Sequence, residues 1–255
     1  MEQALSILPP ITYLAFIAIE KLFPAQSLTP VRRWRLKGLL FFALGGLIVG
    51  ALPGLWAPFA RAHRLVDLEH LGTPLGFFVA LVVGDLLGWL YHRVRHAVTP
   101  LWRIHQMHHS AERLDLAGAF YFHPLDSLGF AFVSTFLASF VVGVTPLAAA
   151  LVGYFGFFMA VFTHANLRTP HWLGYLVQRP ESHAIHHERG VHAFNYGDLA
   201  LWDLVFGTFR NPAAAPRQVG FWDGASARVG AMLVGIDVSQ PPEEGVRLAE
   251  RATAG

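Results

Sequence analysis

Residues 92–109 read HRVRHAVTPLWRIHQMHH and carry five of the fourteen histidines, spaced as HxxxH and then HxxHH. A second HxxHH occupies residues 183–187, and His164 stands alone between the two HxxHH motifs. Residues three and four apart share one face of a helix, so each motif gathers its histidines while Arg93 and Arg95 are expected to point toward lipid headgroups or solvent. Three such clusters set among long apolar stretches indicate a multinuclear metal site at a membrane surface.

The composition favours one integral-membrane domain spanning residues 1–255. The chain is 54% hydrophobic and only 14% charged, whereas soluble domains carry roughly 25% charged residues. Its mean hydropathy is +0.42. A formal charge of +2 is too small to indicate nucleic acid as a partner, and the lack of cysteine excludes disulfides, zinc–thiolate sites and iron–sulfur clusters held by this chain.

A spanning helix needs roughly 20 mostly apolar residues. The stretches that fit are residues 7–23, 39–56, 75–91, 127–144 and 146–162. The last two are joined by a tight turn and form either two spans or a re-entrant hairpin, so we predict an all-α bundle of four or five membrane helices. A cytosolic helical cap, residues 92–126 and 163–211, is expected to hold the histidines. A C-terminal tail, residues 212–255, is expected to form a loop and a short terminal helix without chemistry.

Lys and Arg near span ends set the orientation, because cytoplasmic loops carry an excess of both. The loop after the first predicted span is the richer one, with Lys21, Arg32, Arg33, Arg35 and Lys37. With five spans, this puts the N-terminus outside and all three histidine motifs on the cytoplasmic side. Ala-, Leu-, Gly- and Arg-rich usage, together with the lack of an ER-retrieval tail, favours a bacterial inner membrane.

Adjacent histidines point about 100° apart on a helix, so each HxxHH motif can serve two metals. The predicted ligands are His92, His96, His105, His108, His109, His164, His183, His186 and His187. They supply two metals with four or five nitrogens each. Imidazole suits Zn, Cu, Fe and Ni, but a structural zinc uses about four ligands and a catalytic zinc about three plus water. Nine ligands favour two iron ions that activate O2.

Three further residues are candidates for the site or its surroundings. His123 and His192 lie close enough to the motifs along the chain to bind a metal or to support a ligand. Asp85 lies seven residues before His92, on nearly the same helical face, and is predicted to accept an N–H from a ligand histidine. The alternative for Asp85 is a partner on the backbone or an arginine of a neighbouring helix.

The runs HRVRH, HQMHHS and PESHAIHH, the isolated THAN around His164, and the closing NYG, WD and FGTF resemble the fatty acid hydroxylase / sterol desaturase superfamily over residues 75–210. The resemblance implies a membrane-embedded, non-haem di-iron oxygenase that uses O2 to oxidise a C–H bond of a lipid. It makes the nine histidines ligands. It implies structural support beneath the site from Asn195, Tyr196, Gly197, Trp202 and Asp203.

The sequence departs from the family pattern at two places. Tyr121 and Phe122 precede His123, where family members often carry an arginine. His192 stands where many relatives have an acidic residue, so a role as ligand does not carry over to it.

Hydroxylation of a sterol, fatty acyl chain or related lipid is the predicted reaction, and desaturation by the same site is the alternative. The chain has no cysteine, no G-x-G-x-x-G and no cytochrome b5-like segment, which implies a separate electron donor. Three rivals remain open. A membrane zinc hydrolase would want H-E-x-x-H, which is absent, although Glu188 follows His187. A haem cytochrome would place histidines within opposed spans, and a metal transporter would need polar residues along its spans.

Overall fold

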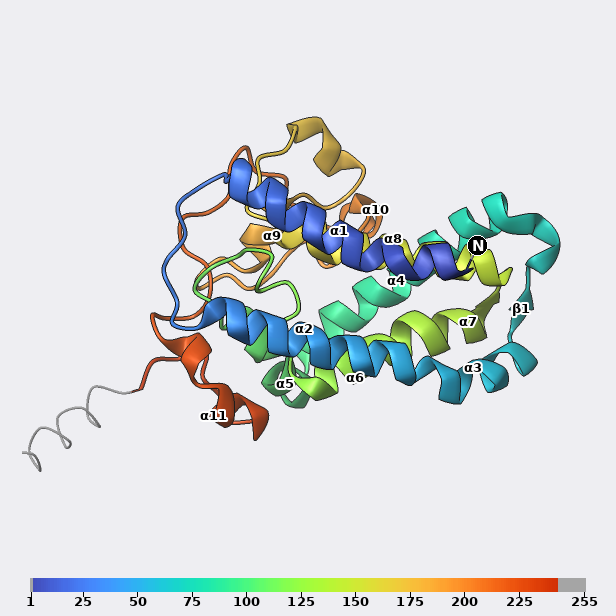
Figure 1. Cartoon of the computed structure of the whole chain (residues 1–255), viewed down its shortest axis with the longest axis horizontal. Helices are drawn as coiled ribbons and strands as arrows, with labels where there is room; N and C mark the ends of the chain where they lie inside the picture. The colour runs from blue at the N-terminus through green and yellow to red at the C-terminus, as the bar shows by residue number, and fades with distance from the viewer. Residues whose placement is uncertain (1, 243–255) are drawn as a thin grey trace, which may run out of the picture.

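The computed structural model describes residues 2–242, and its regular elements are mostly helices, which confirms the all-α prediction. Long helices lie side by side in a bundle, and the stretch Pro124–Val141, made of α6, η2 and α7, runs along it as one further helix (Figure 1). The longer helices are α1 (Glu2–Leu22), α2 (Trp34–Ala51), α3 (Pro53–Ala62), α4 (Gly72–Ala97), α5 (Thr99–His109) and α8 (Pro146–His164). The shorter helices are α6 (Pro124–Ala131), α7 (Ala138–Val141), α9 (Pro180–His186), α10 (Ala200–Val205) and α11 (Val229–Leu233). Short 3-10 helices are η1 (Glu69–Leu71), η3 (His171–Tyr175) and η4 (Ala225–Ala227), and η2 (Phe132–Leu137) is a π-helix that joins α6 to α7.

The chain is an integral membrane protein. Among residues 2–242, four helical stretches are long and apolar enough to cross a membrane. They are Trp34–Ala62, Glu69–Ala97, Pro124–Val141 and Pro146–His164, and each overlaps one predicted span. The remaining predicted span, residues 7–23, falls almost entirely within α1, which packs along α8 (Figure 1). Whether α1 crosses the membrane stays a prediction.

Large apolar side chains cover the outside of the bundle. Leu14 on α1 is 64% exposed, Leu47 on α2 is 70% exposed and Leu55 on α3 is 77% exposed. Soluble proteins rarely expose contiguous apolar patches of this kind, and a bilayer solvates them. The outer faces of these helices therefore suit contact with lipid acyl chains.

The two ends of the bundle differ. At one end, α5, α9 and α11 form the cap, and at the other end β1 (Val66–Asp67) pairs in parallel with β2 (Val142–Gly143) (Figure 1). Residues 212–242, predicted to be part of a tail, instead pack into the cap. Phe221, Met232 and Val238 lie in a buried cluster with Trp34 and Tyr121. The rest of the predicted tail, residues 243–255, lies outside the described part of the chain.

Candidate metal centre

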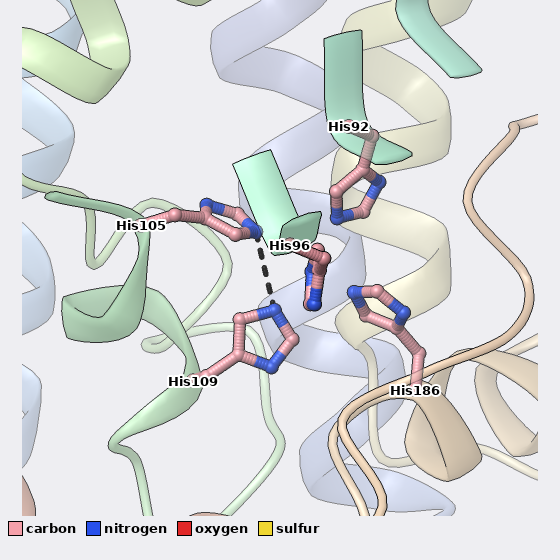
Figure 2. A group of neighbouring side chains, drawn as sticks. All are labelled: His92, His96, His105, His109 and His186. Carbon is pink, nitrogen blue, oxygen red and sulfur yellow. Dashed lines mark hydrogen bonds between the residues drawn. The ribbon is translucent and has the colours of Figure 1, made fainter. Parts of the chain in front are cut away.

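All nine histidines of the predicted ligand set lie together in and beside the cap, in two clusters. The five-histidine cluster contains His92, His96, His105, His109 and His186 (Figure 2). The four-histidine cluster contains His108, His164, His183 and His187. Within each cluster, every histidine offers one ring nitrogen that lies within 4.8 Å of the others.

Each HxxHH motif contributes to both clusters. In α5 the first and last histidines enter the five-histidine cluster, whereas His108 enters the four-histidine cluster. In the motif at the end of α9, His183 and His187 enter the four-histidine cluster, and His186 enters the five-histidine cluster. Adjacent side chains point about 100° apart on a helix, which is consistent with the placement of His108 and His109 in different clusters.

Prolines set the helix boundaries that bring the motifs together. Helix α4 ends at Ala97 because Val98 is extended, and α5 then begins with Pro100 in its first turn. Proline is tolerated there because N–H groups in the first turn of a helix have no acceptor within the helix, so the N–H that proline lacks costs no hydrogen bond. Pro180 begins α9 in the same way. The break after α4 lets α5 pack back against it, so the second motif faces the first.

Backbone carbonyls orient two rings of the five-histidine cluster. His92 Nδ1 donates to the carbonyl oxygen of Tyr196 at 2.9 Å, and His186 Nδ1 donates to that of Phe194 at 2.7 Å. A neutral imidazole that donates from Nδ1 carries its lone pair on Nε2. Both rings therefore present Nε2 to the centre of the cluster.

Side chains orient one ring in each cluster. His105 Nδ1 lies 2.8 Å from Oδ2 of Asp126, and His183 Nδ1 lies 2.8 Å from Oε1 of Gln178. Both oxygens are acceptors, so each histidine donates from Nδ1. Metal-binding histidines typically donate their other ring N–H to a carboxylate or carbonyl in this way.

In the four-histidine cluster, the lone pairs of two rings face one another at close range. His164 Nδ1 donates to the carbonyl oxygen of Ala160 at 2.8 Å, which leaves a lone pair on Nε2. His183 Nδ1 donates to Gln178, so its Nε2 also carries a lone pair, and it lies 3.1 Å from Nε2 of His164. Nε2 of His108 lies 3.1 Å from Nε2 of His164, and Nε2 of His187 lies 3.1 Å from Nε2 of His183. The facing lone pairs of His164 and His183 repel, and a cation between them would relieve the repulsion.

The five-histidine cluster contains buried nitrogens that lack any partner. Nε2 of His92, His96 and His186 is buried without a hydrogen bond to any residue in the described part of the chain. A buried polar atom left unpaired costs about 1–3 kcal/mol. The donor set of both clusters therefore fits a metal ion, since coordination would satisfy these nitrogens.

Burial keeps the histidines outside the membrane spans neutral. It lowers the pKa of His105 to about 4. Burial, reinforced by neighbouring histidines, also holds further pKa values well below 6.5, those of His108, His109, His183, His186 and His187. A metal binds the neutral ring, so these side chains are ready to coordinate near pH 7.

Asp203 holds the chain directly behind the five-histidine cluster. Its carboxylate, 2% exposed, accepts the backbone N–H groups of Tyr196 and Gly197, both at 3.0 Å. It also accepts from Trp89 Nε1 at 3.0 Å and from the Thr208 hydroxyl. The carbonyl that orients His92 belongs to Tyr196, whose backbone N–H donates to Asp203. Asp203 therefore acts on His92 indirectly, by holding the backbone of Tyr196.

Asn195 and Trp202 complete this support. Asn195 has a positive φ of 49°, and its amide donates to the carbonyl oxygen of Ser182 at 2.8 Å. Asparagine tolerates this left-handed conformation better than most residues. Trp202 Nε1 donates to the carbonyl oxygen of Val82 on α4 at 3.1 Å. All five residues for which the resemblance implies support thus lie in one segment beside the clusters.

The prediction that Asp85 accepts an N–H from a ligand histidine is wrong. Its Oδ1 accepts the backbone N–H of Asp198 at 2.8 Å and that of Leu199 at 3.3 Å. Backbone partners, the alternative considered for this residue, are therefore present. Asp85 ties the support segment to α4 instead of touching a ligand.

His123 and His192 have different positions. His123 caps α6, with Nδ1 accepting the N–H of Leu125 and Nε2 lying 3.2 Å from the carbonyl oxygen of Leu233. Both ring nitrogens of His123 therefore have partners outside the two clusters, and the prediction that it binds a metal is wrong. His192 Nδ1 lies 3.3 Å from Nδ1 of His109, on the side of that ring away from the cluster.

Sequence reasoning missed Asp126 and Gln178, and it misplaced Arg95. Arg95 is 1% exposed and donates to Oδ1 of Asp126 at 2.7 Å, so it points into the protein and not toward lipid headgroups or solvent. The single signal for Asp126 was a carboxylate three residues after His123, inside an apolar stretch. Nothing in the sequence separates Gln178 from other polar loop residues.

Comparison with known proteins identifies the family. A family model described as fatty acid hydroxylase matches residues 77–208, just over half of the chain, and the match contains all nine histidines. The chain belongs to the fatty acid hydroxylase family. It is therefore an enzyme of a family of membrane lipid hydroxylases and monooxygenases.

Curated relatives of this family act on different lipids. The chain is 33% identical to the ornithine lipid hydroxylase OlsE of Rhizobium tropici, over 79% of this chain and 67% of the relative. It is 30% identical to the very-long-chain aldehyde decarbonylase GL1-9 of Oryza sativa subsp. indica, over 60% and 61%. It is 28% identical to sphinganine C4-monooxygenase 1 of Arabidopsis thaliana, over 63% and 64%. The chain spans about two thirds of the length of these relatives. No solved structure matches it.

Proposed function

We propose that this protein hydroxylates a C–H bond of a membrane lipid, using O2, two iron ions held by the nine histidines, and electrons from a separate donor. The observation that carries the proposal is the pair of buried histidine clusters, one with five converging ring nitrogens and one with four. The clusters include His92, His96 and His164, which lie in the last turns of two candidate membrane helices. A lipid that stays in the bilayer could present a carbon there.

The number and type of donors support a metal pair in which both ions are redox active. Neutral imidazoles suit iron, copper, nickel and zinc. Structural zinc needs about four ligands and catalytic zinc about three plus a water, so a five-nitrogen centre beside a four-nitrogen centre exceeds what either requires. When bound, an iron pair supplies the O2 activation and C–H oxidation chemistry.

The chain's own residues bind the pair, orient its ligands and exclude water. Hydrogen bonds at Nδ1 fix which nitrogen of each oriented ring faces the metal, so little reorganisation accompanies binding. Phe122 stacks on His108 with ring centroids 4.1 Å apart and planes 20° apart. This ring covers the four-histidine cluster on one side and would contact an apolar chain that approaches it.

The relatives support a lipid with a long chain and a polar head as the substrate class. Ornithine lipid and sphinganine, named for two relatives, share this character. The exposed apolar faces of α1 and α2 border the lipid phase, from which such a molecule would enter. We further propose one membrane domain with its cap in the cytoplasm of a bacterial cell, where a soluble electron donor can reach it.

The test begins with the metal content of protein made in iron-replete cells and purified in mild detergent. We expect about two irons per chain in the wild type and their loss in His108→Ala and His186→Ala. His171→Ala is the matched control, because His171 is exposed on η3 and outside both clusters. Zinc that does not exchange for iron, with no O2 consumption on reduction, would overturn the proposal in favour of a hydrolase.

The second arm identifies the reaction. Reduced, iron-loaded protein is incubated with a membrane lipid extract and isotopically labelled O2, and the lipids are analysed by mass spectrometry. Gain of one labelled oxygen atom by a lipid supports hydroxylation. Loss of two hydrogens without labelled oxygen would overturn hydroxylation in favour of desaturation.

A further inference from the structure

A buried ion pair is attached to one ligand of the five-histidine cluster. Asp126 on α6 places Oδ1 at 2.7 Å from Arg95 on α4 and Oδ2 at 2.8 Å from Nδ1 of His105 on α5. Arg95 and Asp126 are each 1% exposed. The guanidinium also lies over the ring of Tyr91, 4.6 Å from its centroid. Three helices thus meet in one chain of contacts that ends on a metal-facing histidine.

This carboxylate makes the two clusters electrically unequal. Among the described residues, the partners that orient His92, His186 and His164 are backbone carbonyls, and the partner of His183 is the neutral amide of Gln178. Asp126 is the one anionic group hydrogen-bonded to a ring of either cluster within residues 2–242. Water screens such charges poorly in a buried site.

We propose that Asp126, held by Arg95, is a positioning residue that makes the five-histidine cluster the tighter of the two metal sites, so that the two metals load in order. This inference rests on the proposed function. The carboxylate fixes the orientation of His105 and attracts a cation bound at Nε2 of the same ring. Arg95 keeps the carboxylate in place but opposes that attraction, because its own charge repels the cation.

The two partners therefore have opposite effects on metal binding. Removing the negative charge with Asp126→Asn leaves Arg95 to repel the metal, and should weaken the tighter binding step about 10–100-fold, the range usual for residues behind a ligand. Removing the positive charge with Arg95→Met leaves a buried carboxylate whose best counter-charge is the metal. That variant should bind the first metal at least as tightly as the wild type.

The experiment is an anaerobic titration of metal-free protein in detergent with Fe(II), in competition with a chromogenic chelator. We expect two binding steps in the wild type, with the tighter step surviving in His187→Ala, which removes a nitrogen donor from the four-histidine cluster and none from the five-histidine cluster. Asp115→Asn is the matched control. Asp115 is a buried carboxylate, 3% exposed, that pairs with Arg113 and Trp34 away from both clusters.

If Asp126 and Arg95 served folding alone, each variant would weaken both metal-binding steps together. Asp126→Asn and Arg95→Met would then change the affinity for the first metal in the same direction. That result, or two equal binding steps in the wild type, would overturn the inference. If either single variant fails to fold, the double variant removes both charges at once, which buried pairs tolerate better than the loss of one partner. Compared with whichever single variant folds, the double variant should bind the first metal more tightly than Asp126→Asn, or more weakly than Arg95→Met. Failure of the wild type to bind any metal would instead overturn the proposed function.

Discussion

Replacing Asp203 with asparagine tests how the support segment holds the five-histidine cluster. The carboxylate accepts four hydrogen bonds, from two backbone N–H groups, the Trp89 indole and the Thr208 hydroxyl. Asparagine keeps nearly the same shape, but it removes the charge and turns one oxygen into an NH2 group. Oδ1 takes three of the four donors, so the NH2 would face the N–H of Gly197, and two donors would meet.

The structure gives the scale of the effect. A hydrogen bond to a charged group contributes about 1.5–3 kcal/mol, and an unsatisfied buried donor costs about 1–3 kcal/mol. We expect Asp203→Asn to lower the free energy of unfolding by about 2–4 kcal/mol. At about 2–4 °C per kcal/mol for a chain near this size, the Tm should fall by roughly 4–16 °C.

The assay is thermal unfolding followed by tryptophan fluorescence, with both proteins metal-free in the same detergent at the same scan rate. Asp223→Asn is the control, because Asp223 pairs with Arg189 on the surface with its side chain 82% exposed. Surface pairs contribute about 0–1 kcal/mol, so this control should melt close to the wild type. An Asp203→Asn variant that melts with the wild type, or no lower than the control, would refute the reasoning.

Three further predictions follow from the same contacts. Metal-free protein should lose stability as the pH falls from about 7 toward about 5. Burial lowers the pKa of His105 and His192 to about 4 in the folded protein, whereas histidines of the unfolded chain have a pKa near 6.5, so protons bind the unfolded chain first. Thermal unfolding measured across this range would contradict the prediction if the stability stayed flat or rose. Gln178→Leu removes the acceptor for His183 Nδ1 and should weaken metal binding at the four-histidine cluster about 10-fold or more, and an unchanged chelator competition would count against it. Leu47→Arg, at a site 70% exposed in a candidate span, should oppose membrane insertion by up to about 3 kcal/mol; unchanged membrane-fraction yield would argue that this face does not meet lipid.

The features that sequence alone predicted are those encoded over short distances. Apolar stretches located all four candidate spans, because a bilayer imposes length and composition on each helix separately. The HxxHH spacing indicated two centres, because the angle between adjacent side chains is a property of the helix itself. The first predicted span and the side of the membrane on which the cap lies stay predictions.

The features that sequence missed depend on which surfaces meet. Arg95 looks like a headgroup-facing cation between two histidines, and only the approach of α6 gives it Asp126 as a buried partner. Asp85 shares a helical face with His92, yet the segment at residues 198–199 reaches its carboxylate first. Residues 212–242 carry too little periodicity to predict packing, but their apolar side chains find Trp34 and Tyr121 in the cap.

The two clusters are also joined through the residues behind them. Gln178 accepts from His183 in the four-histidine cluster, and its NH2 donates to the carbonyl oxygen of Asn195. Asn195 lies between Phe194 and Tyr196, whose carbonyls orient two rings of the five-histidine cluster. One amide therefore fixes a ligand of one centre and the backbone that positions ligands of the other. Because α5 and α9 each supply histidines to both clusters as well, a shared framework sets the separation of the two clusters, and a shift of one cluster would displace histidines of the other.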